Sequence, residues 1–192
     1  MTILILGLLL FLGVHSVRIL ADGWRSRTMA RIGERPWKGL YTLVSLVGFA
    51  LIVWGYGLAR AQPVQLWSPP PAMRHVSALL TAIAFILLAA AYVPGNGIKS
   101  RLHHPMVLSV QVWALAHLMA TGNVAHVVLF GSFLLWAVLN FRAARQRDRL
   151  AGTVYAAGRP SATIMAIAIG LLAWALFAFW LHGLLIGIRP LG

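Results

Sequence analysis

Charged residues are spaced so unevenly along this sequence that six long runs carry almost no formal charge. A bilayer core about 30 Å thick is crossed by about 20 apolar residues in a helix. The runs therefore predict six transmembrane helices, at Thr2–Leu20, Leu40–Ala59, Val76–Val93, Met106–Ala120, Val124–Phe141 and Ala162–Ile188. The chain is 60% hydrophobic and 10% charged and has no Cys, whereas soluble domains are about 45–50% apolar and about 25% charged. We expect an all-α integral membrane protein with one domain over residues 1–192, and we exclude soluble, disordered and disulfide-rich secreted classes.

The basic residues predict how the helices are oriented. The formal net charge is +13, and thirteen of the 16 Lys and Arg residues fall in or beside three alternate connections, which follow the first, third and fifth predicted helices. Positively charged loops face the cytoplasm. We therefore expect both termini outside, the three basic connections in the cytoplasm, and no nucleic-acid partner. The three acids on the same side, Asp22, Glu34 and Asp148, are expected to pair with neighbouring arginines.

Two sequence features indicate which helices are neighbours. The turn Thr121-Gly122-Asn123 has room for a tight hairpin alone, with Gly122 expected to adopt backbone angles that other residues avoid. The helices on either side of it should thus be antiparallel neighbours. In the second predicted helix Tyr41, Ser45, Gly48 and Ile52 form a narrow stripe, a pattern typical of close helix contacts in membranes.

Ionisable side chains inside the predicted spans are candidates for function, because they are expensive to place in hydrocarbon. His15 lies about 20 Å from the outer start of its span, and His117 lies about 17 Å from the inner start of its own. These depths differ by under about 10 Å, which helix tilts of about 20° could absorb. Two imidazoles from different helices can hold a haem iron. Buried histidines that bond across helices are the alternative, and a zinc site is disfavoured.

The remaining histidines are assigned more ordinary positions. His104 lies about 140° around the helix from His117, so the two cannot share a narrow pocket. His126 follows the hairpin and is expected at the membrane interface. His182 is expected near the outer surface, where it could cap a helix end or contact lipid headgroups. Trp113, one turn before His117, could flank a flat cofactor or pack in the core.

Seven short motifs, in this order and spacing, give the chain a family resemblance. They are His15-Ser16, Lys38-Gly39-Leu40-Tyr41-Thr42-Leu43-Val44-Ser45, His104-Pro105-Met106, Trp113-Ala114-Leu115-Ala116-His117, Gly122-Asn123, Leu129-Phe130-Gly131 and Gly187-Ile188-Arg189-Pro190. Together they resemble the NnrU family of bacterial membrane proteins over nearly the whole chain. That family is linked to denitrification and nitric oxide metabolism and is similar to plant zeta-carotene isomerase, a haem-dependent membrane enzyme.

The resemblance implies a place in the bacterial inner membrane, with both termini on the periplasmic side. It also implies haem b, with His15 and His117 as the iron ligands and His104 as a supporting residue. Thiolate ligation is excluded because the chain has no Cys. Arg18, Arg25, Lys38 and Arg101 would lie near the cytoplasmic mouth, where they could pair with haem propionates.

Three functions remain open on the sequence. The first is a redox-dependent cis/trans isomerase of a lipid-soluble polyene. The second is a haem protein that senses nitric oxide, processes it or transfers electrons. The third is a methyltransferase that uses S-adenosylmethionine, because His104-Pro105-Met106 resembles the Arg-His-Pro motif of such membrane enzymes, with Asp148 as the available acid. A coupled transporter is disfavoured, because the span interiors contain neither acid nor proline.

Overall fold

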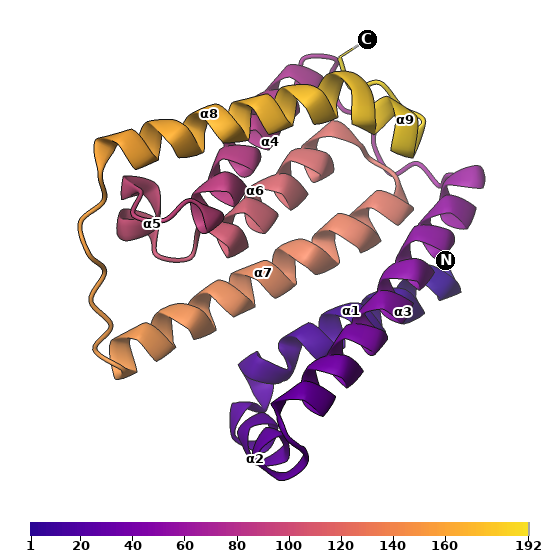
Figure 1. The fold of residues 1–192 in the computed structure, drawn as a ribbon. Helices are drawn as coiled ribbons and strands as arrows, with labels where there is room; N and C mark the ends of the chain where they lie inside the picture. Colours follow the sequence, from indigo (N-terminus) through magenta and orange to yellow (C-terminus); the bar gives the residue numbers. More distant parts are fainter. Residues whose placement is uncertain (192) are drawn as a thin grey trace.

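A computed structural model describes residues 1–191, and these residues form helices without a sheet (Figure 1). The elements are α1 (Thr2–Leu20), α2 (Asp22–Ile32), α3 (Glu34–Ala61), α4 (Met73–Tyr92), α5 (Gly97–Leu102), α6 (Pro105–Ala120), α7 (Val124–Leu150), α8 (Pro160–Leu176), the π-helical turn η1 (Phe177–Leu181) and α9 (His182–Ile186). The predicted all-α class is confirmed, and each predicted apolar run is helical over most of its length.

Five helical stretches are long and apolar enough to cross a membrane. They are α1, α3, α4, α7 and the continuous stretch Pro160–Ile186. Large side chains on their outer faces are exposed, as at Leu9 and Leu172, which suits contact with lipid. The sixth apolar helix, α6, has 16 residues and is therefore about 24 Å long.

The long helices form a curved row in which each packs against the next (Figure 1). The order across the row is α3, α1, α7, α6, α4 and α8. The predicted contact between α6 and α7 is confirmed. The row places α7 between the α1/α3 pair and the group formed by α4, α6 and α8.

Glycines let α1 and α3 approach closely, as the stripe in the second predicted helix indicated. A Cβ added at Gly48 would lie 2.7 Å from the backbone nitrogen of Phe11, and one added at Gly7 would lie 2.6 Å from that of Ile52. Gly48 and Ile52 belong to the predicted stripe, and both are buried. This confirms the stripe as a helix contact.

The bundle has two distinct ends. The basic end holds the connections around residues 21–33, 93–104 and 151–159, whereas the hairpin end holds residues 62–72 and the α6–α7 turn. At the hairpin end, the backbone nitrogens of Leu66 and Trp67 donate to the Gly122 carbonyl at 2.7 and 3.1 Å. Gly122 was expected to adopt backbone angles that other residues avoid, and this prediction is wrong, because its φ is not positive. Glycine suits this position because Trp67 packs where a Cβ would lie.

Two helical features lie outside the predicted runs, and a third interrupts the last run. α2 is a separate helix between α1 and α3, and α7 continues past Phe141 to Leu150 through a charged stretch. Arg, Ala and Gln favour helix without needing burial, which explains why hydropathy alone ends α7 too early. Near the C-terminus, η1 inserts a π-turn between α8 and α9.

Candidate functional site

His15 lies in α1 near the basic end, among aromatic rings from three helices. Its Nδ1–H donates to the Phe11 carbonyl at 2.6 Å, and its ring stacks on that of Phe11 at 4.3 Å. Tyr41 of α3 and Trp136 of α7 lie 5.1 and 6.1 Å from it, centroid to centroid. The indole Nε1 of Trp136 is buried and has no hydrogen-bond partner among the described residues. His15 Nε2 makes no hydrogen bond within residues 1–191, which leaves it available to a ligand.

His117 in α6 repeats this local arrangement. Its Nδ1–H donates to the carbonyl of Trp113, four residues earlier, at 2.8 Å. Its ring stacks on Phe130 of α7 at 4.4 Å. The Trp113 ring is 5.2 Å away, so the predicted proximity of Trp113 to His117 is confirmed. Both imidazoles thus bond through Nδ1 to the carbonyl of an aromatic residue one turn earlier, which fixes the ring and leaves Nε2 free, as in metal-ligating histidines.

The structure does not place His15 and His117 face to face. A row of three rings, Phe11, Phe133 and Trp113, connects them, with centroids 5.9 Å apart from Phe11 to Phe133 and 5.6 Å apart from Phe133 to Trp113. His117 lies three residues before the end of α6, and His15 lies five residues before the end of α1. His117 therefore lies toward the hairpin end, whereas His15 lies toward the basic end.

The donor set nevertheless suits haem iron, because each imidazole is anchored and has a free Nε2. A single haem held by both histidines would have to displace the rings between them. Among residues 1–191, no three His, Cys, Asp or Glu side chains are close enough to hold a metal ion together. A haem needs two axial ligands at most, so that result leaves the assignment of His15 and His117 as a prediction.

The cationic residues predicted beside the haem, Arg18, Lys38 and Arg101, all lie at the basic end. Lys38 pairs with Glu34 at 2.6 Å on the exposed start of α3. Arg18 is exposed in the last turn of α1, and Arg101 lines a separate cleft between α5 and α8. Asp22 pairs with Arg25 at 3.5 Å, as predicted.

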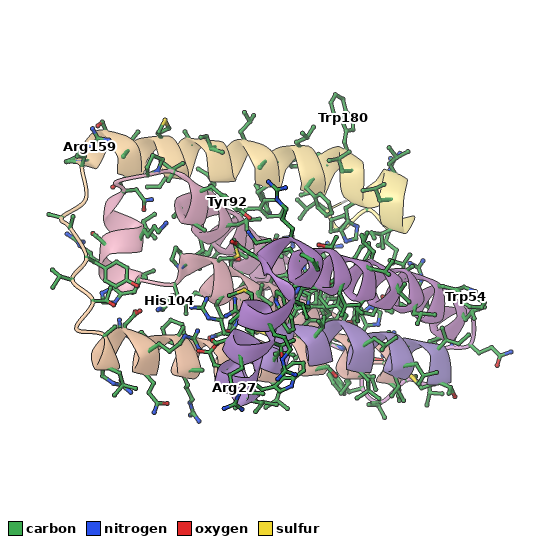
Figure 2. The ribbon with its side chains drawn as sticks, turned by 60° about the horizontal axis from the view of Figure 1, so that its bottom comes forward. Arg27, Trp54, Tyr92, His104, Arg159 and Trp180 are labelled. Carbon is green, nitrogen blue, oxygen red and sulfur yellow. The ribbon has the colours of Figure 1, made fainter. Side chains whose placement is uncertain are left out.

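His104 belongs to a polar cluster at the basic end (Figure 2). Its Nε2 lies 2.7 Å from Asp148 Oδ2, and the Tyr155 hydroxyl donates to the same oxygen at 2.9 Å. Burial and this hydrogen bond to Asp148 raise the pKa of Tyr155 above its usual value. His103 stacks on Tyr155 at 4.0 Å and contacts Arg145. The predicted arginine partner for Asp148 is wrong, because chain folding brings His104 and Tyr155 to this carboxylate instead.

A second polar cluster, at the hairpin end, escaped the sequence analysis. The Tyr56 hydroxyl donates to His126 Nε2 at 2.9 Å, and His126 Nδ1–H donates to Asn123 Oδ1 at 2.7 Å. His126 lies in the first turn of α7, at the hairpin end, and its side chain is buried. One signal was present in the sequence: Asn123 three residues before His126 is a helix-capping pattern. The partner, Tyr56, is 70 residues away and gave no local signal.

His182 bonds across a helix end, which is one of the two roles left open on the sequence. Its Nδ1–H donates to the Ile188 carbonyl at 2.7 Å, across the end of α9. Arg60 of α3 also donates to this region, to the Ile186 carbonyl at 2.9 Å. These bonds fasten the C-terminal turn to the hairpin end.

Comparison with protein family models identifies the family of this chain. The family model described as NnrU protein matches residues 3–190. The chain belongs to the NnrU family. Comparisons with curated proteins and with solved structures give no match. Family membership therefore rests on the match to the NnrU family model.

Proposed function

We propose that this NnrU family member crosses the bacterial inner membrane six times, with both termini in the periplasm. The proposal counts α6 as a span, because it packs between α4 and α7. A helix about 24 Å long is shorter than a core of about 30 Å, and local thinning of the bilayer offsets that difference at modest cost. The three basic connections at one end favour a cytoplasmic location for that end.

Single cysteines test this topology, because the chain has none of its own. Lys99→Cys and Thr153→Cys, at exposed positions of the basic end, should be labelled by a membrane-impermeant maleimide after lysis alone. Ser68→Cys and Thr121→Cys, at the hairpin end, should be labelled in intact spheroplasts. If Lys99→Cys and Thr121→Cys are labelled under the same conditions, the two residues lie on the same side and α6 does not cross the membrane.

Within this bundle, we propose, the protein binds haem b, which His15 and His117 would hold through their free Nε2 atoms. The observation that carries this proposal is the shared anchoring of the two imidazoles, at 2.6 Å to Phe11 and 2.8 Å to Trp113, with Nε2 free on each. The buried, unpartnered Nε1 of Trp136 beside His15 adds a donor for a polar group of the ligand. Phe11, Phe133 and Trp113 pack against one another between α1, α7 and α6, and once moved aside they would give the bound group apolar surroundings.

The reaction class follows from the family resemblance. When bound, haem would supply reversible one-electron chemistry, which suits cis/trans isomerisation of a lipid-soluble polyene or the chemistry of nitric oxide. The methyltransferase alternative is less favoured, because the cavity beside Asp148 has a volume of about 160 Å³. Pockets for ligands of drug size measure about 300–1,000 Å³.

Absorption spectra of the detergent-purified protein, oxidised and dithionite-reduced, test the proposal. The parent should show a Soret band and sharp reduced bands, and His15→Ala and His117→Ala should each weaken or shift them. His75→Ala is the matched control, because His75 is exposed outside the proposed site, and its spectrum should equal that of the parent. A colourless parent, after expression with ample haem, would overturn the proposal.

Phe133 provides a sharper test of the shared site. If haem displaces the ring between Phe11 and Trp113, Phe133→Ala should retain the full haem content, whereas Phe133→Trp should lower it. The alternative is that a single histidine holds the iron. In that case both Phe133 variants should keep the haem content of the parent, and only one of the two histidine variants should lose haem.

A further inference from the structure

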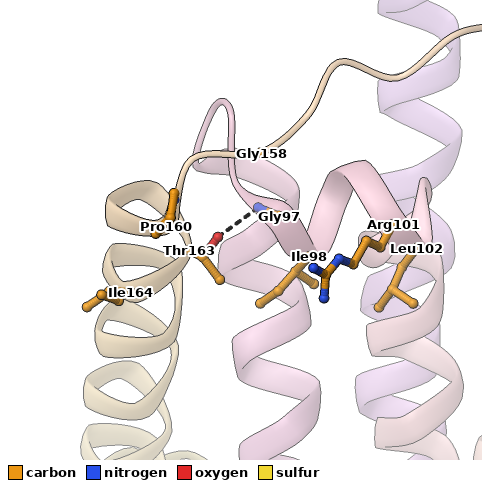
Figure 3. Close-up of a pocket in the computed structure, with 8 residues that line it drawn as sticks. All are labelled: Gly97, Ile98, Arg101, Leu102, Gly158, Pro160, Thr163 and Ile164. Carbon is orange, nitrogen blue, oxygen red and sulfur yellow. Dashed lines mark hydrogen bonds between the residues drawn. The ribbon is translucent and has the colours of Figure 1, made fainter.

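A cleft of about 540 Å³ opens at the basic end between α5 and the start of α8 (Figure 3). Its volume falls within the range of about 300–1,000 Å³ that is common for ligand pockets. Among its lining residues are Ile98, Arg101 and Leu102 of α5 and Thr163 and Ile164 of α8. This cleft is separate from the aromatic row that joins His15 to His117.

The walls of the cleft are tied together by hydrogen bonds. The backbone nitrogen of Gly97 donates to Thr163 Oγ1 at 2.8 Å, and that of Arg159 donates to the Gly95 carbonyl at 2.8 Å. A Cβ at Gly158 would collide with the backbone of Gly97. The short α5 is therefore fixed against α8, and the cleft between them has a defined shape.

Asn96 fixes the start of α5 from inside the protein. Its side chain is 1% exposed, and its Nδ2 donates to the carbonyls of Ala90 and Val93 at 2.8 and 2.5 Å. Its Oδ1 accepts from the Lys99 backbone nitrogen at 2.8 Å. These three bonds set the angle at which α5 leaves α4, and thus the direction in which Arg101 points.

Arg101 is the charged side chain of this cleft. No acidic residue lines the cleft, and none of the ion pairs within residues 1–191 includes Arg101. Figure 3 shows its guanidinium group beside Ile98 and Leu102. The site therefore combines one positive, hydrogen-bonding group with apolar walls.

We infer that this cleft binds an anionic phospholipid, with the lipid phosphate on Arg101 and an acyl chain along Ile98, Leu102 and Ile164. Leu102 and Ile164 are 41% and 67% exposed, on a protein whose long helices face lipid, so an acyl chain would cover them. A guanidinium group binds phosphate oxygens through paired N–H donors, and basic pockets between helices near a charged leaflet bind anionic headgroups.

The apolar walls decide between a lipid and a soluble phosphate. A soluble anion would leave Ile98, Leu102 and Ile164 in water, whereas a phospholipid uses both parts of the cleft. The inference does not depend on haem binding, and it holds whichever leaflet lies at the basic end.

Photo-crosslinking of lipids in nanodiscs tests the site. The protein is reconstituted with phosphatidylglycerol or phosphatidylcholine that carries a photoactivatable group in one acyl chain, and crosslinked peptides are mapped by mass spectrometry. In the parent, phosphatidylglycerol should label residues 97–102 and 160–164 several-fold more than phosphatidylcholine does. Arg101→Gln should lower the phosphatidylglycerol yield about fivefold, which corresponds to about 1 kcal/mol for one Arg near a membrane surface.

Arg142→Gln is the matched control, because Arg142 is exposed at the same end but does not line the cleft. Arg142→Gln should leave labelling within about twofold of the parent. Arg101→Lys should retain most of the phosphatidylglycerol yield, because it keeps the positive charge. Equal labelling by the two lipids, or an equal loss in Arg101→Gln and Arg142→Gln, would overturn the inference. Full protection by inorganic phosphate alone would assign the site to a soluble anion and overturn the lipid.

Discussion

The α1/α3 pair and the group of α4, α6 and α8 are held together by different contacts. Between α1 and α3, glycines bring the backbones close, and no side-chain hydrogen bond joins the two helices among the described residues. In the α4 group, buried polar groups bond across helices. Ser77 Oγ of α4 donates to the Ala116 carbonyl of α6 at 2.7 Å, and Trp174 Nε1 of α8 donates to Thr81 Oγ1 of α4 at 3.1 Å.

The difference shows two ways of packing helices where lipid removes the hydrophobic driving force between them. Close backbone contact depends on many van der Waals contacts at once, so one added side chain disturbs the whole interface. A cross-helix hydrogen bond is local and averages about 0.6 kcal/mol in a membrane protein. The α1/α3 pair should thus be sensitive to added volume, and the α4 group to lost polar atoms.

The largest expected effect is that of Gly55→Leu in α3. A Cβ at Gly55 would overlap the backbone of Leu4 in α1, so the helices must separate. We expect a loss of about 3 kcal/mol in the free energy of unfolding, at the upper end of the range for overpacking. Gly57→Leu is the matched control, because a Cβ at Gly57 meets nothing within 4 Å. The measurement is reversible SDS unfolding in mixed micelles, and equal stability of the two variants would remove glycine contact as the basis of the α1/α3 pair.

Asn96→Ala should be the next largest change, now in the α4 group. It removes a helix cap, worth about 1 kcal/mol, and leaves two buried carbonyls without their donors. We expect a total loss of about 2 kcal/mol. Asn140→Ala, at a partly buried asparagine of α7 without a side-chain hydrogen bond to the described residues, should cost less than about 0.5 kcal/mol. A loss in Asn96→Ala no greater than in Asn140→Ala would contradict the role given to polar atoms here.

Much of the helical frame could be predicted from hydropathy, because an apolar run must form its own backbone hydrogen bonds in lipid. α1 begins and ends as predicted, and Gly48 and Ile52 marked the contact with α1 through their spacing. α2 and the end of α7 were missed because their helical structure does not depend on apolar composition. The length of α6 was predicted correctly within one residue.

The polar sites were harder to predict, because their partners are far apart in sequence. Asp148 meets His104 across 44 residues, and Tyr56 meets His126 across 70. Local signals, such as a neighbouring arginine for Asp148, favoured the wrong partner. The aromatic row between His15 and His117 was missed for the same reason. Its central residue, Phe133, belongs to α7, whereas the two histidines belong to α1 and α6.

Tyr155→Phe should sharpen the comparison through its dependence on pH. The Tyr155 hydroxyl donates to Asp148 of α7, which also contacts His104 at the start of α6. Burial raises the pKa of Tyr155 in the folded protein above its ordinary value of 10.0. The unfolded chain then loses its proton first, so this tyrosine stabilises the fold below about pH 10 and loses that contribution as pH rises further. The parent should therefore lose stability above pH 10 more steeply than Tyr155→Phe does. Thermal unfolding in detergent between pH 8 and about 11 measures this, with exposed Tyr92→Phe expected to follow the parent.

The smallest expected effect belongs to Ser77→Ala, and it separates the two packing modes most directly. Ser77 Oγ bonds to a different helix, whereas Ser45 Oγ of α3 bonds to the Tyr41 carbonyl of its own helix at 2.8 Å. Both changes remove one oxygen, so the difference between them isolates the bond across helices. We expect Ser77→Ala to cost about 0.6 kcal/mol and Ser45→Ala to cost close to zero, because its bond joins no second helix. If both variants cost the same in SDS unfolding, the α4–α6 contact does not depend on this bond, and close packing alone would account for both regions.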